Sequence, residues 1–446
     1  MWMVVITLRD KIKCFEFNNC PMGKKINFFI LSIIVIICVY SASNYQELTA
    51  TIDSGDTAWM IVASAFVLLM TPGLSFFYGG MVSKKNIIST MLQSFIALGV
   101  ISILWVLVGF SLAFGDSIGG IIGNPLTYFA FNNVGLEPNS DFSSTIPFLL
   151  FALFQLKFAI ITPALITGSF AGRVRFRSYI FFMVLFSLLI YSPLAHMTWH
   201  PDGLFRNWGI LDFAGGTVVH MSAGFAALAG AIFLGKRKEI IESPANVPYV
   251  ILGTGLLWFG WFGFNAGSAL GANSDAVIAF ANTNIASATA MITWIFYERM
   301  LGRKMSAVGA CIGAVVGLVA ITPAAGFVNI GQSMFIGFIA AIISNYAIHL
   351  KNKTNVDDTL DVFPSHGVGG IVGMLLTAVF AKQVGLIYGQ TDTFLYHLLG
   401  LVLVSVYCFF GSYLLYMFVD RVLTMRVRED QEERGLDLSQ HGEKLE

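Results

Sequence analysis

The fold is decided by the stretch Asp212-Phe-Ala-Gly-Gly-Thr-Val-Val-His220-Met-Ser-Ala-Gly-Phe-Ala-Ala-Leu-Ala-Gly230, whose pattern recurs in Asp361-Val-Phe-Pro-Ser-His366-Gly-Val-Gly-Gly-Ile-Val-Gly-Met-Leu-Leu376. Both stretches are apolar and rich in small residues, and each carries an aspartate before a single histidine. An ionisable residue in a membrane span is rare and usually faces a cavity or a partner. One such histidine alone could equally be a structural residue bonded to a backbone carbonyl. Two in matching contexts favour a shared functional site.

Composition places the chain among membrane proteins. Of 446 residues, 56% are hydrophobic and only 12% are charged, with a mean hydropathy of +0.74. A soluble domain carries about 25% charged residues. We therefore predict an all-α polytopic membrane protein, embedded in the lipid bilayer of the cell membrane. The formal net charge of zero gives no support for a nucleic-acid partner.

The first part of the chain has the pattern of a targeting segment. Lys24 and Lys25 precede an apolar run over residues 28–40, and the small residues 41–43 follow it. This order is typical of a signal peptide with its cleavage site, so we expect a leader over residues 1–43. An uncleaved anchor is the alternative, and Met22 could be the true start of translation.

Runs of about 20 apolar residues predict the spans of a transmembrane domain over residues 56–425. A cytoplasmic tail, residues 426–446, follows it. Eleven candidate spans lie near residues 56–80, 88–115, 145–170, 178–199, 213–235, 247–271, 275–298, 305–323, 329–350, 363–381 and 394–420.

The connections between these spans alternate in charge. One set is basic and contains Lys84, Arg173, Lys236, Arg299 and Lys351, with further basic residues in the C-terminal tail. The other set is mostly acidic. Basic loops stay in the cytoplasm, which predicts an external mature N-terminus, a cytoplasmic C-terminus and an odd number of spans.

The two histidines then fall in helices of opposite direction. His220 lies in the fifth span and His366 in the tenth. Helices five apart in an alternating series cross the membrane antiparallel. We therefore expect an inverted repeat of five plus five helices, followed by a final helix, with the site at the repeat interface.

Neutral imidazoles suit the passage of a small polar molecule. Each offers one hydrogen-bond donor and one acceptor, and burial away from counter-charges favours the uncharged form. Such a pair can bond to each other, interact with a small hydrogen-bonding molecule and repel bare cations. A metal site is the competing hypothesis. It lacks nearby Cys, Asp or Glu ligands, so we expect no metal and no cofactor.

A second group of residues lies toward the outer ends of other spans. Trp199 ends the fourth span, Gln155 and Phe158 lie in the third, and Phe264 and Ser268 lie in the sixth. A tryptophan there is often only an interfacial anchor. Aromatic faces also bind small cations for about 0.5–2 kcal/mol, and a hydroxyl can accept an N–H bond. A charged group costs at least about 2.5–3.5 kcal/mol in hydrocarbon, so a bound cation would do better to lose a proton first.

The chain resembles the ammonium transporter family (Amt/Mep/Rh), over nearly all of its length from Asp56 to Glu443. The resemblance is carried by five motifs in the right order, namely Thr71-Pro-Gly-Leu-Ser-Phe-Phe-Tyr78, Asp212 to His220, Gly260-Trp-Phe-Gly-Phe-Asn-Ala-Gly-Ser268, Asp361 to His366, and the tail Arg428 to Glu443. It implies an eleven-helix subunit, a homotrimer, one pore per subunit, and ammonium or methylammonium as substrate. It implies a transporter, not an enzyme.

The resemblance also implies roles for single residues. Trp199 and Ser268, with Phe158, correspond to an external ammonium-recruiting site, as in the Amt/Mep branch. Phe158 and Phe264 correspond to a stacked phenyl gate, and the pair His220 and His366 to a twin-histidine pore. The supporting residues are Gln155 beside the gate and Asp212, which we also expect to be the N-cap of the fifth helix.

Some features depart from the family or leave alternatives open. Lys157 places an ammonium group in a membrane helix; a helical step turns it away from the Phe158 face, toward a subunit interface or a snorkelling position. The loop over residues 200–206 is bulkier than the glycine-rich stretch often found there.

An ammonium sensor or receptor using the same pocket is the rival function. Such members usually add a long C-terminal signalling domain, whereas this chain stops soon after the tail. The basic loops and tail suggest a cytosolic regulator, and the family suggests a PII-type signalling protein.

Overall fold

The computed structural model describes residues 32, 51–239 and 243–445 of the chain. The leader expected over residues 1–43, with its cleavage site and the alternative start at Met22, lies outside the described residues apart from Ser32. The last residue of the expected tail, 446, also lies outside them.

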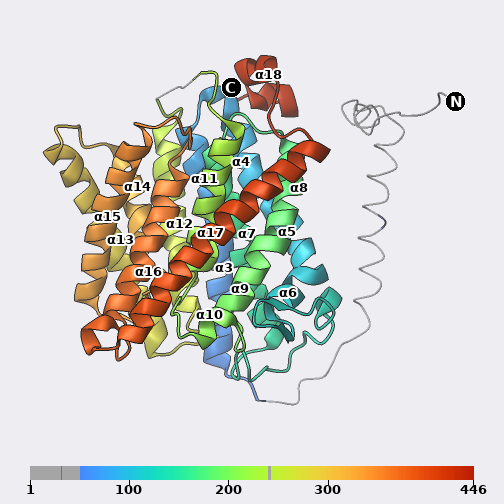
Figure 1. Ribbon diagram of the computed structural model, residues 1–446, viewed down its shortest axis with the longest axis vertical. Helices are drawn as coiled ribbons and strands as arrows, with labels where there is room; N and C mark the ends of the chain where they lie inside the picture. The colour runs from blue at the N-terminus through green and yellow to red at the C-terminus, as the bar shows by residue number, and fades with distance from the viewer. Residues whose placement is uncertain (1–31, 33–50, 240–242, 446) are drawn as a thin grey trace.

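The described chain is helical almost throughout, and Figure 1 shows its long helices packed side by side in one bundle. The α-helices are α3 (Ser54–Met81), α4 (Ile87–Phe95), α5 (Ala97–Leu104), α6 (Phe110–Phe114), α7 (Phe148–Ile166), α8 (Phe176–Phe186), α9 (Ser192–Trp199), α10 (Leu204–Asn207), α11 (Ser222–Leu234), α12 (Val247–Gly267), α13 (Ser274–Met300), α14 (Ala307–Ile321), α15 (Ile330–Lys351), α16 (Gly369–Phe380), α17 (Thr391–Val422) and α18 (Glu429–Arg434).

Short turns interrupt or extend these helices. The π-helical turns are η3 (Trp105–Gly109), η6 (Ser187–Tyr191), η7 (Gly216–Met221), η8 (Phe363–Val368) and η10 (Asp437–His441). The 3₁₀ turns are η2 (Lys84–Asn86), η4 (Phe129–Phe131), η5 (Thr167–Phe170) and η9 (Leu386–Tyr388). Two short antiparallel strands, β1 (Ser117–Ile118) and β2 (Ile122–Gly123), pair Ser117 with Gly123.

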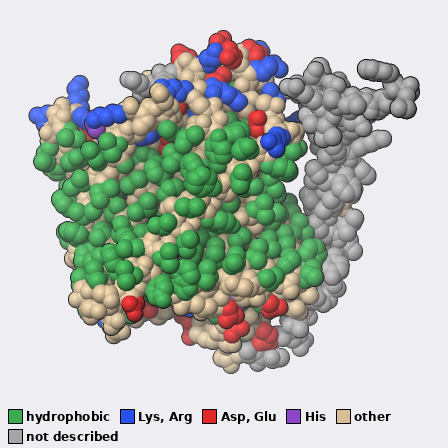
Figure 2. All heavy atoms as spheres, in the orientation of Figure 1, with side chains coloured by type: hydrophobic (Ala, Val, Ile, Leu, Met, Phe, Trp, Pro, Cys, Tyr) green, Lys and Arg blue, Asp and Glu red, His purple; other side chains and the backbone are tan. Residues whose placement is uncertain are grey.

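In the described part of the chain, ten helical segments are long and apolar enough to cross a membrane. A further apolar helix, α14, has only 15 residues. Every range predicted as a span contains a helix, which confirms the all-α multi-pass architecture, while the count of eleven stays a prediction. Figure 2 shows the corresponding surface, a broad hydrophobic band between two polar rims. A hydrophobic band of this kind lies in the lipid of a membrane. Helices are stable there because they satisfy their own backbone hydrogen bonds.

Small residues let the helices approach closely. The clearest case is α12 against α3, where a Cβ added to Gly253 would lie 2.2 Å from the backbone nitrogen of Phe77. A Cβ on Gly263 would similarly lie 2.6 Å from the carbonyl oxygen of Ala63. Close backbone packing of this kind replaces the hydrophobic driving force that lipid does not supply.

The C-terminal tail is docked on the loops at one end of the bundle, the end at which Figure 1 places α18. The Asp437 carboxylate accepts hydrogen bonds from the backbone nitrogens of Ile88 (3.0 Å) and Ser89 (2.7 Å) at the start of α4. An anion there also complements the positive end of the helix dipole. Glu432 accepts a 2.7 Å bond from the backbone nitrogen of Lys238. The tail is therefore an ordered part of the subunit.

Candidate functional site

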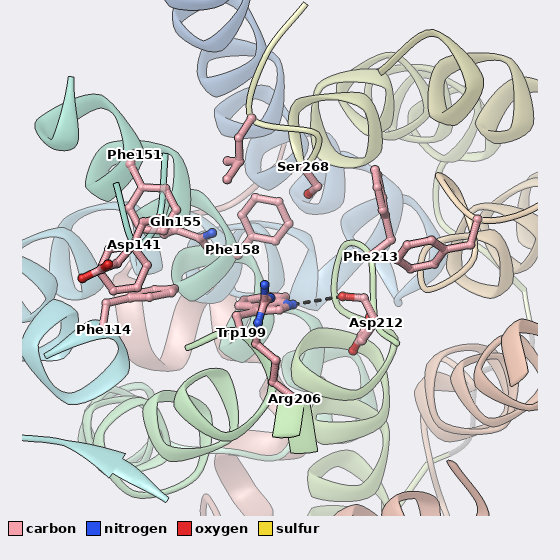
Figure 3. A pocket seen from close by; sticks show the side chains of 13 residues that line it. Phe114, Asp141, Phe151, Gln155, Phe158, Trp199, Arg206, Asp212, Phe213 and Ser268 are labelled. Atoms are coloured by element: carbon pink, nitrogen blue, oxygen red, sulfur yellow. Dashed lines mark hydrogen bonds between the residues drawn. The ribbon is translucent and has the colours of Figure 1, made fainter. Parts of the chain in front are cut away.

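A cavity of about 230 Å³ opens at the end of the bundle opposite the tail, and Figure 3 shows the side chains that line it. Five of the residues predicted from sequence meet here, and they come from four separate parts of the chain. They are Gln155 and Phe158 of α7, Trp199 of α9, Asp212 before η7 and Ser268 after α12. Asp141 and Arg206, which the sequence did not single out as site residues, also line the cavity.

Trp199 is held as a wall of this cavity. Its indole Nε1 donates a 3.1 Å hydrogen bond to the carbonyl oxygen of Asp212, drawn as the dashed line in Figure 3. Its ring meets the edge of Phe158 at a centroid distance of 5.9 Å. The tryptophan therefore lies within the subunit and is not placed as an anchor on the lipid-facing surface.

The carboxylate of Asp212 organises the start of the fifth span. It accepts hydrogen bonds from the backbone nitrogens of Gly215 (2.8 Å), Gly216 (2.6 Å) and Thr217 (2.7 Å), and from the Thr217 hydroxyl (2.5 Å). The N-cap position itself is Gly215, whose φ of 116° suits glycine. The prediction of Asp212 as the N-cap was therefore wrong in position, because the aspartate supplies the capping acceptor from three residues upstream.

Two further polar side chains, Ser268 and Gln155, line the cavity. The Ser268 hydroxyl donates its proton to the carbonyl oxygen of Phe264 at 2.9 Å, which leaves its lone pairs free to accept. The buried Gln155 Oε1 has no hydrogen-bond partner among the described residues. An aromatic wall with a hydroxyl acceptor and a side-chain amide suits a small cation that carries several N–H groups.

Phenylalanines close the inner end of the cavity. The rings of Phe158 and Phe264 lie 4.2 Å apart between centroids, tilted by 33°, and both side chains are fully buried. Phe264 also lies 6.0 Å from His220. The pair of phenylalanine rings therefore lies between the cavity and the histidines.

The two histidines lie beneath the gate and face each other. Their ring centroids are 5.4 Å apart at an interplanar angle of 26°, and Nδ1 of His366 lies 3.4 Å from Nδ1 of His220. The outer ring edge of His220 is buried, and its Nε2 has no hydrogen-bond partner among the described residues. A direct imidazole contact requires opposite tautomers, so one ring donates and the other accepts.

Both histidines lie in π-helical turns built in the same way. Asp212 accepts from the backbone nitrogen five residues later, and Asp358 does the same toward Phe363 at 2.7 Å. Each aspartate lies eight residues before its histidine. The counterpart of Asp212 is therefore Asp358, not Asp361 as the sequence comparison had paired them. Asp361 instead forms a 2.7 Å ion pair with Lys351. π-helical turns are rare and concentrate at functional sites.

The helices that carry the histidines cross with almost no space between them. A Cβ added to Gly224, one turn after His220, would lie 2.2 Å from the backbone nitrogen of Gly367 and 2.4 Å from its Cα. Gly367 follows His366 directly. The absence of a side chain at position 224 therefore sets the separation of the two imidazoles.

Sequence reasoning missed Trp261 as part of the site. Its ring stacks on His220 at 5.3 Å and 21°, and its Nε1 donates to the Thr322 hydroxyl at 2.9 Å. It lies three residues before Phe264, on the same face of α12, so helical spacing could have indicated it. His397, in contrast, is a structural residue whose ring nitrogens contact the backbone of Thr393 and Leu211.

Within the ranges that the structure describes, no group of three or more His, Cys, Asp or Glu residues could hold a metal ion. Cys311 and Cys408 are both free and buried. The residues that meet at the site are thus aromatic rings, neutral hydrogen-bonding groups and the charged residues Asp141, Arg206 and Asp212, of which the Asp212 carboxylate is already hydrogen-bonded.

The pH dependence of stability tests the role of Asp358, which lies in the loop before η8. Burial, and then the nearby Asp361, raise the pKa of its carboxyl from 3.8 to about 6. Between these values the folded protein holds a proton that the unfolded chain releases, so the free energy of unfolding falls as pH rises, by up to about 3 kcal/mol. We expect Asp358→Asn to flatten this slope in thermal unfolding measured from pH 4 to pH 6.5. If the free energy of unfolding of Asp358→Asn fell with pH as steeply as that of the wild type, the raised pKa of Asp358 would not be the cause.

Comparison with known proteins decides the family. The model of the Ammonium Transporter Family matches residues 58–445. The chain belongs to this family. An ammonium transporter of Aquifex aeolicus is 47% identical over 418 residues, covering 92% of this chain and 97% of that protein. The crystal structure of Saccharomyces cerevisiae Mep2 superposes with a TM-score of 0.81 at 33% identity, covering 87% of this chain and 94% of Mep2.

The same family fold also includes a solved structure described as a sensor Amt protein. It superposes with a TM-score of 0.81 at 31% identity, covering 87% of this chain and 98% of that one. The family fold alone therefore does not distinguish a transporter from a sensor. That distinction has to be argued from the residues of the site.

Proposed function

We propose that this protein transports ammonium, recruiting external NH4+ in the cavity, releasing a proton near the gate and conducting NH3 past the histidines. The observation that carries the proposal is a continuous column of rings leading inward from the cavity. Successive centroid distances are 5.9 Å from Trp199 to Phe158, 4.2 Å to Phe264, 6.0 Å to His220 and 5.4 Å to His366.

Recruitment uses the indole face and the free oxygen acceptors. NH4+ over Trp199 gains a cation–π interaction, while Ser268 and Gln155 accept its N–H bonds. Asp212 fixes the indole through its carbonyl oxygen and places a carboxylate at the cavity wall. Its four accepted hydrogen bonds hold that carboxylate in place.

The gate favours deprotonation over passage of the ion. A bare cation between two phenyl rings loses its hydration, at a cost of at least about 2.5–3.5 kcal/mol, whereas neutral NH3 does not carry that penalty. The proton therefore passes to an acceptor at the level of Phe158 and Phe264, either the solvent that reaches the cavity or the His220 Nε2, which has no hydrogen-bond partner among the described residues. Whether it then follows the histidines is a matter for current measurement.

The histidine pair offers a polar path in an otherwise apolar pore. When one Nδ1 donates to the other, one ring retains an Nε2 acceptor and the other an Nε2–H donor. NH3 can both donate and accept, so each ring can hold it in turn. A metal-type role is not supported, because no further ligands converge on the pair in the described ranges.

The topology proposed for the subunit is the one expected from sequence. It has eleven spans, with α14 as the short one, in a 5+5 inverted repeat plus α17, which the matching Asp212 and Asp358 turns support. The domain covers residues 56–425, followed by the tail, and the leader over residues 1–43 is a signal peptide. The mature N-terminus is external and the C-terminus cytoplasmic, in line with the basic residues that gather at the tail end of Figure 2.

Assembly and regulation extend the same proposal. The subunit forms a homotrimer with one pore in each copy, and a PII-type protein binds the cytoplasmic face, where the tail and basic loops meet. The protein acts as a transporter, not an enzyme. The receptor alternative has no observation in its favour beyond the shared fold, and measurable flux through the purified protein separates the two.

The recruitment site is tested by Trp199→Leu and Ser268→Ala. A cation–π contact of about 0.5–2 kcal/mol corresponds to about a twofold to thirtyfold rise in the half-saturating methylammonium concentration for the tryptophan variant. Uptake into proteoliposomes measures it. Trp208→Leu is the matched control, because Trp208 packs on Phe205 and Tyr396 and does not line the cavity. Equal half-saturation in all four proteins would reject the site.

A further inference from the structure

Lys157 is a charged residue that the proposed pore does not use. It lies in α7 directly before the gate residue Phe158, and it shares a partly exposed helix face with Leu149 and Leu153. Its ammonium group has no hydrogen bond or ion pair within the described ranges. These three are the only residues of α7 that are not buried, so this face points out of the subunit.

The depth of Lys157 leaves its charge inside the hydrocarbon. It lies nine residues after Phe148, the first residue of α7, which places it about 14 Å along the helix. A four-carbon stem does not reach the membrane surface from there. A cation at such a depth requires a partner, and the described part of one subunit does not supply it.

Asn284 is another polar residue on the outward surface, at a similar depth. It lies ten residues after Ser274, the first residue of α13, or about 15 Å along that helix. It is exposed on one face with Val277 and Phe280, and its amide has no hydrogen bond within the described part of the chain. A polar amide among apolar lipid-facing residues is also unfavourable without a partner.

Contacts inside the subunit place both residues at the level of the gate. Phe158, beside Lys157, stacks on Phe264. Asn265, beside Phe264, donates a 2.9 Å hydrogen bond to Thr283, which is the neighbour of Asn284. The two unpartnered groups therefore share one membrane depth. They lie on different faces, since α13 packs against α12, α14 and α15.

We propose that Lys157 of one subunit donates a hydrogen bond to the side-chain oxygen of Asn284 in a second copy of this chain. Copies related by rotation about the membrane normal keep every residue at the same depth. In a head-to-tail ring, one face of each copy contacts a different face of the next copy. Each copy then supplies one lysine and one asparagine, so both groups are satisfied all round the ring. This inference deepens the assembly part of the proposed function by naming its contact.

Cysteine cross-linking tests the contact directly. In full-length protein whose native cysteines are replaced, Lys157→Cys combined with Asn284→Cys is expected to give covalent oligomers with a short bismaleimide cross-linker, because the lysine side chain spans more distance than a disulfide does. The matched control is Lys157→Cys with Val277→Cys, because Val277 is 70% exposed on the same face but seven residues, about 10 Å, nearer the helix start. The control pair is expected to stay monomeric on a denaturing gel.

A double-mutant cycle on Lys157 and Asn284 gives a second, independent test. Asn284→Leu leaves the lysine unpaired and is expected to weaken oligomer association by about threefold to tenfold per contact. Adding Lys157→Met removes the unpaired charge and restores association. The contact would be overturned by equal cross-linking of both cysteine pairs, or by no cross-linking in protein that remains oligomeric. It would also be overturned if the native protein were monomeric, or if the double variant associated no better than Asn284→Leu. Cross-linking is read without transport, so cross-linked protein lacking uptake would reject the proposed function and keep the contact.

Discussion

Replacing His220 or His366 with alanine is expected to lower methylammonium uptake by about threefold to tenfold and to reduce selectivity for ammonium over potassium. Each imidazole supplies one of the hydrogen bonds that a neutral molecule makes in the pore, with a net worth of about 0.5–1.5 kcal/mol. The single variants also leave the opposite ring, 3.4 Å away at Nδ1, without its partner. Uptake and current in proteoliposomes measure both effects.

His349→Ala is the matched control for these variants. His349 lies in the last turn of α15, beside Tyr346 and away from the pore residues. Its replacement should leave uptake unchanged. Wild-type rate and selectivity in both His220→Ala and His366→Ala would show that the pair is structural only.

Gly224→Ala is expected to abolish uptake, although it touches no proposed substrate contact. The new Cβ would overlap the backbone of Gly367, which cannot move as a flexible side chain could. Overpacking of this kind typically costs about 1–3 kcal/mol and here must also separate the two histidine-bearing segments. Thermal unfolding in detergent and uptake together measure the loss.

Gly255→Ala provides the control for that substitution. Gly255 lies in α12, and nothing lies within 4 Å of a Cβ added there. Stability and uptake should remain at wild-type values. Full activity of a folded Gly224→Ala protein would contradict the claim that this crossing sets the histidine separation.

The sequence predicted the all-α multi-pass fold class, because membrane spans are encoded locally. Apolar runs about 20 residues long and alternating loop charges need no tertiary information. The family resemblance then assigned Trp199, Ser268 and the two histidines to one path. The structure places Trp199 and the histidines along one column of rings and Ser268 in the lining of the cavity at its outer end. Their roles remain a proposal.

Other features depend on three-dimensional contacts that no local pattern encodes. Asp212 and Asp358 occupy equivalent positions because each accepts a hydrogen bond from the backbone nitrogen five residues later. Asp361 lies closer to its histidine in the sequence but makes no such bond among the described residues. The π-helical turns, and Gly215 as the N-cap, follow from the same bonds. The partner of Lys157 could not be seen either, because a second copy of the chain supplies it in our proposal.

The central claim is most directly tested by a rapid ammonium pulse on proteoliposomes containing the purified protein, with uptake of labelled methylammonium and current recorded together. We predict saturable uptake that depends on Trp199 and is impaired in the histidine variants, with the current reporting whether the proton crosses too. Folded, oligomeric protein that binds ammonium yet shows neither uptake nor current would contradict transport and favour a receptor.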